Sequence, residues 1–249
     1  MATKEALGKT EQINGRRYYN VEEGTQYPSV TTILGAFADQ SGLDKWRKRV
    51  GEAEANRISK FSANRGTVMH QLCEYYILSE KPTPKEKREE ALEKIVSFVE
   101  EEGFTEDETR VGKSLFLNFY NCGLFDRIHS VISVEEMLYS HQMGGYAGRV
   151  DNIYGDVEGR PVILDFKSAN KPKKRDWIDN YYEQISAYYL AYWEMHSVKP
   201  KGGEIWISNE YDGVPQIFEV TVNDIKNYGK LFLSKVKRFH QEFCDIPPF

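Results

Sequence analysis

Residues 145–168 read GYAGRVDNIYGDVEGRPVILDFKS, and we expect this stretch to decide the fold. It contains two apolar runs rich in β-branched residues, 146–154 and 161–167. The polar segment 155–160 between them is typical of a turn, so the stretch predicts a β-hairpin.

Three charged side chains lie on this hairpin. Asp151 is near the end of the first run, and Asp165 and Lys167 are in the second. Because side chains alternate along a strand, Asp165 and Lys167 share one face and Phe166 lies on the other. A buried carboxylate needs a partner or a metal. Two carboxylates and a lysine suit Mg²⁺-dependent phosphate chemistry, although an isolated Asp-x-Lys is usually a surface ion pair.

The composition, with 40% apolar and 29% charged residues among 249, is that of a soluble globular protein. We find no membrane-length apolar run and no signal peptide, and expect an intracellular, cytoplasmic protein of a bacterial or virus-infected cell, with no membrane partner. The cysteines Cys73, Cys122 and Cys244 form no C-x-x-C pair. We therefore expect neither a zinc knuckle nor an iron–sulfur cluster.

The net charge of −5 does not by itself favour nucleic acid, but the basic residues are clustered. A solvated surface and a track for phosphates are equally compatible with such clusters. The two basic runs consist of Lys45, Arg47, Lys48 and Arg49, and of Lys171, Lys173, Lys174 and Arg175.

The order of the expected elements describes an α+β protein with a mixed central β-sheet flanked by helices. We expect an N-terminal arm over residues 1–26 and a single domain over 27–249, helical in 27–130 and carrying the catalytic sheet in 131–249. The expected helices span about 30–34, 43–58, 64–78, 84–103, 105–120, 176–195 and 223–243. The expected strands span about 131–140, 146–154, 161–167, 204–208 and 216–222. Ser29, Thr83 and Thr105 are the expected N-caps.

Four short motifs follow one another in the chain, and their order resembles the PD-(D/E)XK nuclease superfamily, in particular its RecB-like exonuclease branch. The resemblance covers about residues 27–243. It is strongest to the mitochondrial genome maintenance exonuclease family and its bacterial and phage relatives, whose N-terminal signature is similar to Pro28-Ser29-Val30-Thr31 and Lys45-Trp46. The motifs are Gly66-Thr67-x-x-His70, Gly148-x-x-Asp151, Asp165-x-Lys167-Ser168 and Gln184-x-x-x-Tyr188.

The resemblance implies a restriction-endonuclease-like core and a metal site. Asp151, Asp165 and the backbone carbonyl of Phe166 would be ligands of Mg²⁺ or Mn²⁺, and His70 would be an added ligand. Ser168 would contact a phosphate or end the strand. These ligands are compatible with one bound metal ion or with two.

The resemblance also implies catalytic roles. Lys167 would position and help to deprotonate the attacking water, and Gln184 and Tyr188 would orient the scissile backbone. Glu135 would hold a metal-bound water or orient Lys167. Its neighbour Glu136 is the alternative, because a shift of register by one residue exchanges their faces.

We expect a metal-dependent DNA exonuclease that prefers single-stranded ends and acts in replication, repair or recombination, with proteins of those processes as further partners. The alternatives are a structure-specific flap endonuclease and a nucleic-acid-binding module with weak or partner-dependent nuclease activity. A basic passage formed by the N-terminal helices would favour a single strand over a duplex. Its lining would be Lys45, Arg47, Lys48, Arg49, Phe61 and Arg65.

Overall fold

A five-stranded mixed sheet forms the centre of the protein, whose computed structural model describes residues 8–243. The strand order is β4-β5-β6-β7-β8, with β6 and β7 parallel and all other neighbours antiparallel. This confirms the expected α+β class and the mixed sheet. The strands are β4 (Ser130–Ser140), β5 (Tyr146–Gly155), β6 (Pro161–Ala169), β7 (Gly202–Asn209) and β8 (Gln216–Val220).

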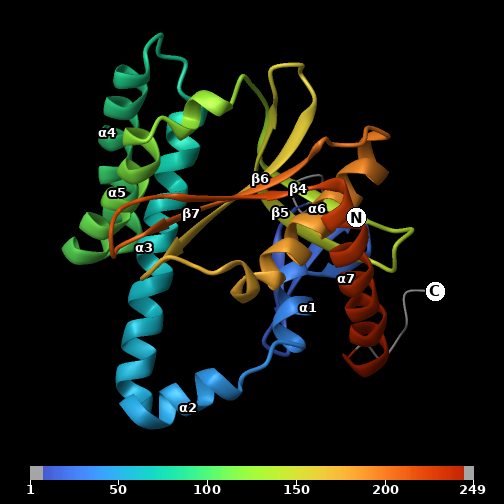
Figure 1. Cartoon of the computed structure of the whole chain (residues 1–249). Helices are drawn as coiled ribbons and strands as arrows, with labels where there is room; N and C mark the ends of the chain where they lie inside the picture. The colour runs from blue at the N-terminus through green and yellow to red at the C-terminus, as the bar shows by residue number, and fades with distance from the viewer. Residues whose placement is uncertain (1–7, 244–249) are drawn as a thin grey trace.

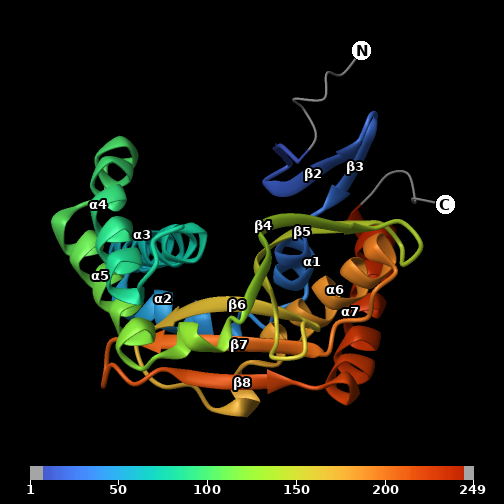
Figure 2. The same cartoon turned by 90° about the horizontal axis from the view of Figure 1, so that it is seen from above.

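Helices cover both faces of the sheet (Figures 1 and 2). One face packs against α1 (Val30–Ala36), α6 (Asp179–His196) and α7 (Val222–Phe243). The other packs against α3 (Glu52–Leu78) and α5 (Glu106–Asn121), and α4 (Pro84–Glu102) packs against these two helices. The remaining helices are α2 (Ser41–Val50) and the 3₁₀ turns η2 (Leu124–Arg127) and η3 (Arg175–Trp177). Within residues 8–243, no helix combines the length and the apolar character needed to cross a bilayer.

Strand β6 contributes side chains to two hydrophobic cores. Ile163 packs with Ile185 of α6 on one face, and Leu164 and Phe166 pack with Phe119 of α5 on the other. All five of these side chains are almost completely shielded from solvent. A strand that is buried on both faces reads as a continuous apolar run, which is why the charged Asp165 stands out in it.

The expected helix starts are confirmed by their capping contacts. The side-chain oxygen of Ser29 accepts a hydrogen bond from the backbone N–H of Thr32, and Thr83 does the same for Glu86. Thr105 and Glu108 form a complete capping box at the start of α5. Each cap satisfies a backbone donor that the first helical turn would otherwise leave unpaired.

Two of the expected helices are wrong in their bounds. The helix expected over 43–58 is divided at Gly51, whose φ of 89° ends α2 and begins α3. From there α3 runs without interruption for 27 residues, through the gap expected between 58 and 64. A positive φ costs glycine little, so one residue is enough to turn the chain.

The segment expected as an arm over residues 1–26 contains a small antiparallel sheet of β1 (Thr10–Ile13), β2 (Arg16–Glu22) and β3 (Thr25–Pro28). Residues 1–7 of this segment lie outside the described residues. The buried Tyr19, Val21 and Tyr27 pack against Ala147 of β5. The boundary expected between residues 26 and 27 therefore falls inside β3, on a small sheet that packs onto β5 of the central sheet.

We expect Gly112→Ala to lower the free energy of unfolding by about 1–3 kcal/mol, because overpacking strains a close helix contact. A Cβ atom at Gly112 would lie 2.6 Å from Val68 Cβ and 2.8 Å from the carbonyl oxygen of Arg65, between α5 and α3. The matched control is Gly42→Ala in α2, where a Cβ atom meets nothing within 4 Å. Urea unfolding should show Gly42→Ala unchanged or slightly more stable; equal losses in both variants would contradict this packing argument.

Candidate active site

The predicted site residues Asp151, Asp165 and Lys167 lie where β5 and β6 separate. Pairing between these strands ends at Asn152 and Leu164, after which β5 continues beside β4 and β6 continues beside β7. The carboxylate of Asp151 then replaces the missing backbone partner: its Oδ2 accepts a hydrogen bond from the N–H of Phe166 at 2.6 Å. This fork places Asp151 next to the strand that carries Asp165 and Lys167.

A buried ion pair and a helix define one wall of the fork. The ammonium group of Lys167 forms an ion pair with Asp165 Oδ2, and Gln184 Nε2 of α6 donates to Asp165 Oδ1 at 3.1 Å. Gln184 Nε2 also lies 3.1 Å from the hydroxyl of Tyr188, to which it donates. The Lys167 Nζ lies 5.2 Å from the ring centroid of Tyr181. The predicted Asp165, Lys167, Gln184 and Tyr188 are thus one connected network.

The opposite wall comes from α3. His70 Nδ1 lies 3.4 Å from Asp151 Oδ2, so the histidine of the first motif meets the aspartate of the second. Glu74 follows His70 by one helical turn and raises the pKa of Glu135 by its charge. Glu74 was not among the predicted site residues. Its spacing of four from His70, which places both on one helix face, was the available signal.

The two glutamates of β4 have different surroundings. Burial first, and then the charges of Asp151 and Glu74, raise the pKa of Glu135 to about 7. Its φ is 52°, in the left-handed region that few residues other than glycine adopt. Glu136 instead contacts His196 of α6, with 2.8 Å between Oε1 and Nε2. Glu135 is therefore the glutamate whose carboxyl group is coupled to the fork.

The two aspartates of the fork have opposite pKa shifts. Burial raises the pKa of Asp165 to about 6, although the ammonium of Lys167 opposes this shift. Burial also disfavours the charged form of Asp151, but His70 and Lys167 outweigh it and lower its pKa. Perturbed carboxyl groups of this kind are concentrated at functional sites. The ionised form is therefore favoured at Asp151 and disfavoured at Asp165.

The donor atoms at the fork suit Mg²⁺ or Mn²⁺. Asp165 Oδ2 is buried, and among residues 8–243 its ion-pair partner is the ammonium group of Lys167. In the same residues no three His, Cys, Asp or Glu side chains are already arranged around a metal position. His70 and Lys167 pair with the two aspartates. Carboxylate and carbonyl oxygens are the donors that hard cations prefer.

Two motif glycines permit close approaches at the site. A Cβ atom at Gly66 of α3 would lie 3.2 Å from the hydroxyl oxygen of Ser168 on β6. A Cβ atom at Gly148 of β5 would lie 2.6 Å from the ring of Tyr188. These glycines let α3 and α6 approach the fork from both sides, which explains the need for glycine in both motifs.

Some of the predicted DNA-binding residues are engaged within the protein. Arg65 is only 3% exposed and contacts Asn170 and Glu210, and burial lowers its pKa. This places Arg65 inside the protein and not along a surface track. Arg47 pairs with Glu52, and Arg175 pairs with Asp179. The other predicted cations have no ion pair within residues 8–243; they are Lys45, Lys48, Arg49, Lys171, Lys173 and Lys174.

The sequence matches the family model of the PD-(D/E)XK nuclease superfamily over residues 37–248. The chain belongs to this superfamily. A search of curated proteins found no match. Among solved structures, SSO0001 is 12% identical, with a TM-score of 0.36 over 63% of this chain and 73% of that one. A presumed exonuclease of Eubacterium rectale is 14% identical, with a TM-score of 0.43 over 61% of this chain and 62% of that one.

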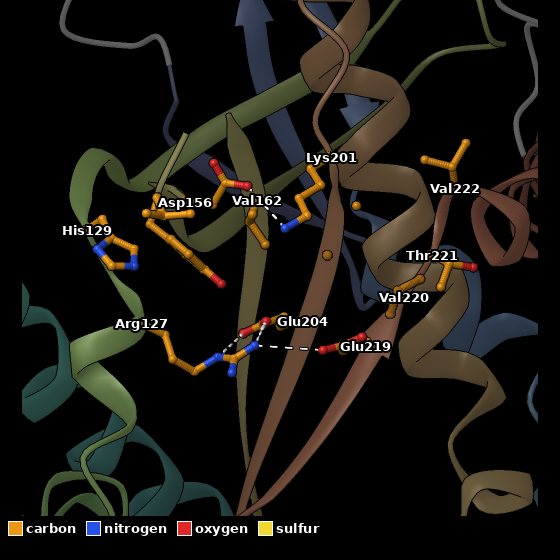
Figure 3. A pocket seen from close by; sticks show the side chains of 14 residues that line it. Arg127, His129, Asp156, Val162, Lys201, Glu204, Glu219, Val220, Thr221 and Val222 are labelled. Carbon is orange, nitrogen blue, oxygen red and sulfur yellow. Dashed lines mark hydrogen bonds and ion pairs between the residues drawn. The ribbon is translucent and has the colours of Figure 1, made fainter. Parts of the chain in front are cut away.

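A cavity of about 380 Å³ lies at the opposite end of the sheet from the nuclease site (Figure 3). Its charged groups are paired with one another: Arg127 with Glu204 and Glu219, and Lys201 with Asp156. Glu204 also accepts a hydrogen bond of 2.7 Å from the indole N–H of Trp206. These contacts join β7 to the η2 turn and β8, so the charges of the cavity stabilise the sheet.

We expect Arg127→Leu to lower the free energy of unfolding by about 1.5–3 kcal/mol, because Glu204 would lose its charged donor while it remains buried. The nuclease site lies at the other end of β6, so the catalytic rate should not change. Arg110→Leu is the matched control, since Arg110 and Asp107 form a pair on the surface. Thermal unfolding and nuclease assays of both variants check this. A large loss of catalytic rate in Arg127→Leu at a temperature where it is folded would contradict it.

The glutamate pair provides a second test. Glu135→Gln should lower the catalytic rate about 10²-fold or more, because it removes a carboxyl group that can exchange a proton near neutral pH beside Asp151. Glu136→Gln affects contacts with His196 and Ser133, away from Asp151 and Asp165, and should keep near-normal activity. The measurement is kcat for nucleic-acid hydrolysis by both variants, with circular dichroism to verify folding. The reverse ranking would mean that Glu136 is the functional residue.

Proposed function

We propose that this nuclease is a metal-dependent exonuclease that hydrolyses single-stranded DNA from its ends. One observation carries the proposal: Asp151, Asp165 and Lys167 meet at the strand fork, with Gln184 behind Asp165. Membership of the superfamily supports phosphodiester hydrolysis. The end preference and the choice of DNA are inferences from the sequence motifs of the exonuclease branch.

Each residue at the fork has a role in this proposal. Asp151, Asp165, the Phe166 carbonyl and His70 would hold Mg²⁺ or Mn²⁺. Such an ion, when bound, lowers the pKa of water and withdraws charge from the phosphate. Lys167 orients the attacking water and donates to the developing negative charge. Burial alone would lower its pKa, but the charges of Asp165 and Asp151 outweigh burial, raise its pKa and keep it protonated.

Three further side chains would position the substrate. Gln184 holds Asp165 and the Tyr188 hydroxyl at the same time, so α6 fixes the direction of the carboxylate. Its remaining hydrogen-bond capacity, with that of Tyr188, would orient the scissile backbone. Ser168 follows Lys167 on β6 and would contact a phosphate oxygen. Fixed donors of this kind cost no reorganisation in the transition state.

Surface cations support binding of the DNA backbone. Lys45, Lys48 and Arg49 lie on α2, which connects the two helical layers, and Lys171 and Lys174 lie in the connection that follows β6. Their attraction to phosphates does not depend on sequence and weakens as salt increases. A degrading enzyme of this kind would act in DNA replication, repair or recombination, together with proteins of those processes.

The test compares an end-labelled linear single strand with a covalently closed single-stranded circle, in Mg²⁺ or in EDTA. The wild type should degrade the linear strand only with metal and leave the circle intact. Lys167→Ala should lower the rate about 10²–10³-fold, because it removes a transition-state donor. Lys201→Ala is the control, since Lys201 pairs with Asp156 at the other end of β6.

The outcomes separate the alternatives. Cleavage of the circle would replace the exonuclease by a flap-type endonuclease with the same catalytic residues. Degradation of RNA in preference to DNA would change the substrate. Binding of the strand without any cleavage, with Mg²⁺ and with Mn²⁺, would leave a binding module and remove the catalytic roles given to Lys167 and Asp165.

A further inference from the structure

Three hydrogen bonds and one buried side chain fix the backbone of the connection between β6 and α6. The side-chain amide of Gln216 on β8 forms two hydrogen bonds with the backbone of Lys173. Its oxygen accepts from the Lys173 N–H at 2.6 Å, and its nitrogen donates to the Lys173 carbonyl oxygen at 2.9 Å. The backbone N–H of Glu210 donates to the carbonyl oxygen of Ala169 at 3.1 Å. Ile178, at the other end of the connection, is completely buried.

Arg175 completes this anchoring. Its guanidinium carbon lies 3.4 Å from the ring centroid of Tyr182, and its nitrogens donate to Asp179 and to the hydroxyl of Tyr228, each at 2.7 Å. The connection runs along the outer side of β8 as a result (Figure 2). These contacts fix the backbone of the connection, and with it the positions from which its exposed side chains extend.

The exposed side chains of this rigid connection include a large aromatic one. Trp177 is 62% exposed, the most of the four tryptophans, although its backbone N–H is bonded to the carbonyl oxygen of Lys174 at 3.0 Å. The Lys174 Nζ lies 5.3 Å from the ring centroid of Trp177. An aromatic ring of this size normally buries much of its surface. Most of the Trp177 side chain is instead exposed to solvent, so it contributes little to the hydrophobic core.

The connection leads directly into the nuclease site. Tyr181 follows Trp177 by four residues, and its ring lies 5.2 Å from the catalytic Lys167 ammonium. The next residues of α6 that face the site are Gln184 and Tyr188. The same rigid segment therefore presents an exposed indole with a cation at one end and the substrate-orienting side chains at the other.

We propose that Trp177 and Lys174 form a base-stacking subsite for single-stranded nucleic acid, in which one unpaired base lies on the indole and the adjacent phosphate meets the lysine. This rests on the proposed function and adds a specific contact to it. Aromatic rings and cations together are the usual means of binding a single strand without reading its sequence, because every base has a flat face. A paired base within a duplex cannot offer that face, so the subsite selects for unpaired nucleotides.

The test removes one base at a time. Linear single strands that carry one abasic site at successive positions from each end are compared by kcat/KM with Mg²⁺. For the wild type, loss of the stacked base should lower kcat/KM about five- to 150-fold at one or two adjacent positions. In Trp177→Ala this dependence on position should disappear, and in Trp177→Phe it should be largely restored.

Trp193→Ala is the matched control. Trp193 also lies beneath a lysine, with Lys199 Nζ 4.2 Å from its ring centroid, but it belongs to the far end of α6. This variant should keep the position dependence of the wild type. Lys174→Gln should weaken binding of every strand equally and reduce the salt dependence by the contribution of one phosphate contact.

The failure of this proposal differs from the failure of the proposed function. If the wild type degrades intact linear strands, and Trp177→Ala retains the abasic-site profile of the wild type, the subsite does not exist while the nuclease assignment stands. If the wild type neither binds nor cuts single strands, the proposed function is wrong, and the subsite that rests on it is wrong as well. An equal effect of Trp193→Ala and Trp177→Ala would also overturn the subsite.

Discussion

The separation of β5 from β6 after Asn152 and Leu164 is the constraint on which the site depends. Inside a continuous antiparallel ladder, Asp151 and the N–H of Phe166 would each be used by backbone pairing, and no open space would remain between the strands. Once the strands diverge, the Phe166 N–H needs another acceptor, since buried backbone donors are rarely left unpaired. The Asp151 carboxylate fills that need at 2.6 Å and is thereby fixed beside β6.

The fork stays open because each strand has a second partner. Beyond the fork β5 remains bonded to β4, and β6 remains bonded to the parallel β7. Helices then close the two sides, with α3 bringing His70 to Asp151 and α6 bringing Gln184 to Asp165. The cores on both faces hold these helices at fixed distances, and Gly66 and Gly148 remove the Cβ atoms that would keep them apart. The charged residues are therefore positioned by the packing of apolar ones.

The sequence was sufficient for those parts of the fold that depend on local pattern. The hairpin of β5 and β6, the caps at Ser29, Thr83 and Thr105, and the mixed sheet follow from alternation, turn residues and capping boxes. The burial of Arg65 could not be predicted from local pattern, because it depends on contacts with Asn170 and Glu210, more than 100 residues further along the chain.

The same limit applies to the small N-terminal sheet and to the glutamates of β4. Strands β1–β3 are attached to the central sheet by the contact of Tyr19 and Tyr27 with Ala147. The polar character of the N-terminal sequence does not predict this contact. Glu135 and Glu136 are neighbours with similar sequence environments, and only the strand register sends one to the fork and the other to His196. Long-range packing, and not local propensity, decides these assignments.

Helix α6 unites the catalytic and the substrate-binding parts of the proposed mechanism. Tyr181, Gln184 and Tyr188 follow one another at intervals of three and four residues, so they lie on one helical face. That face meets β6 at Lys167 and Asp165, while the rigid connection before the helix presents Trp177 to solvent. A displacement of α6 would move all of these groups together. The geometry between a base stacked on Trp177 and the phosphate at Lys167 is therefore set by one rigid element, which is the condition for cleavage at a constant distance from a bound base.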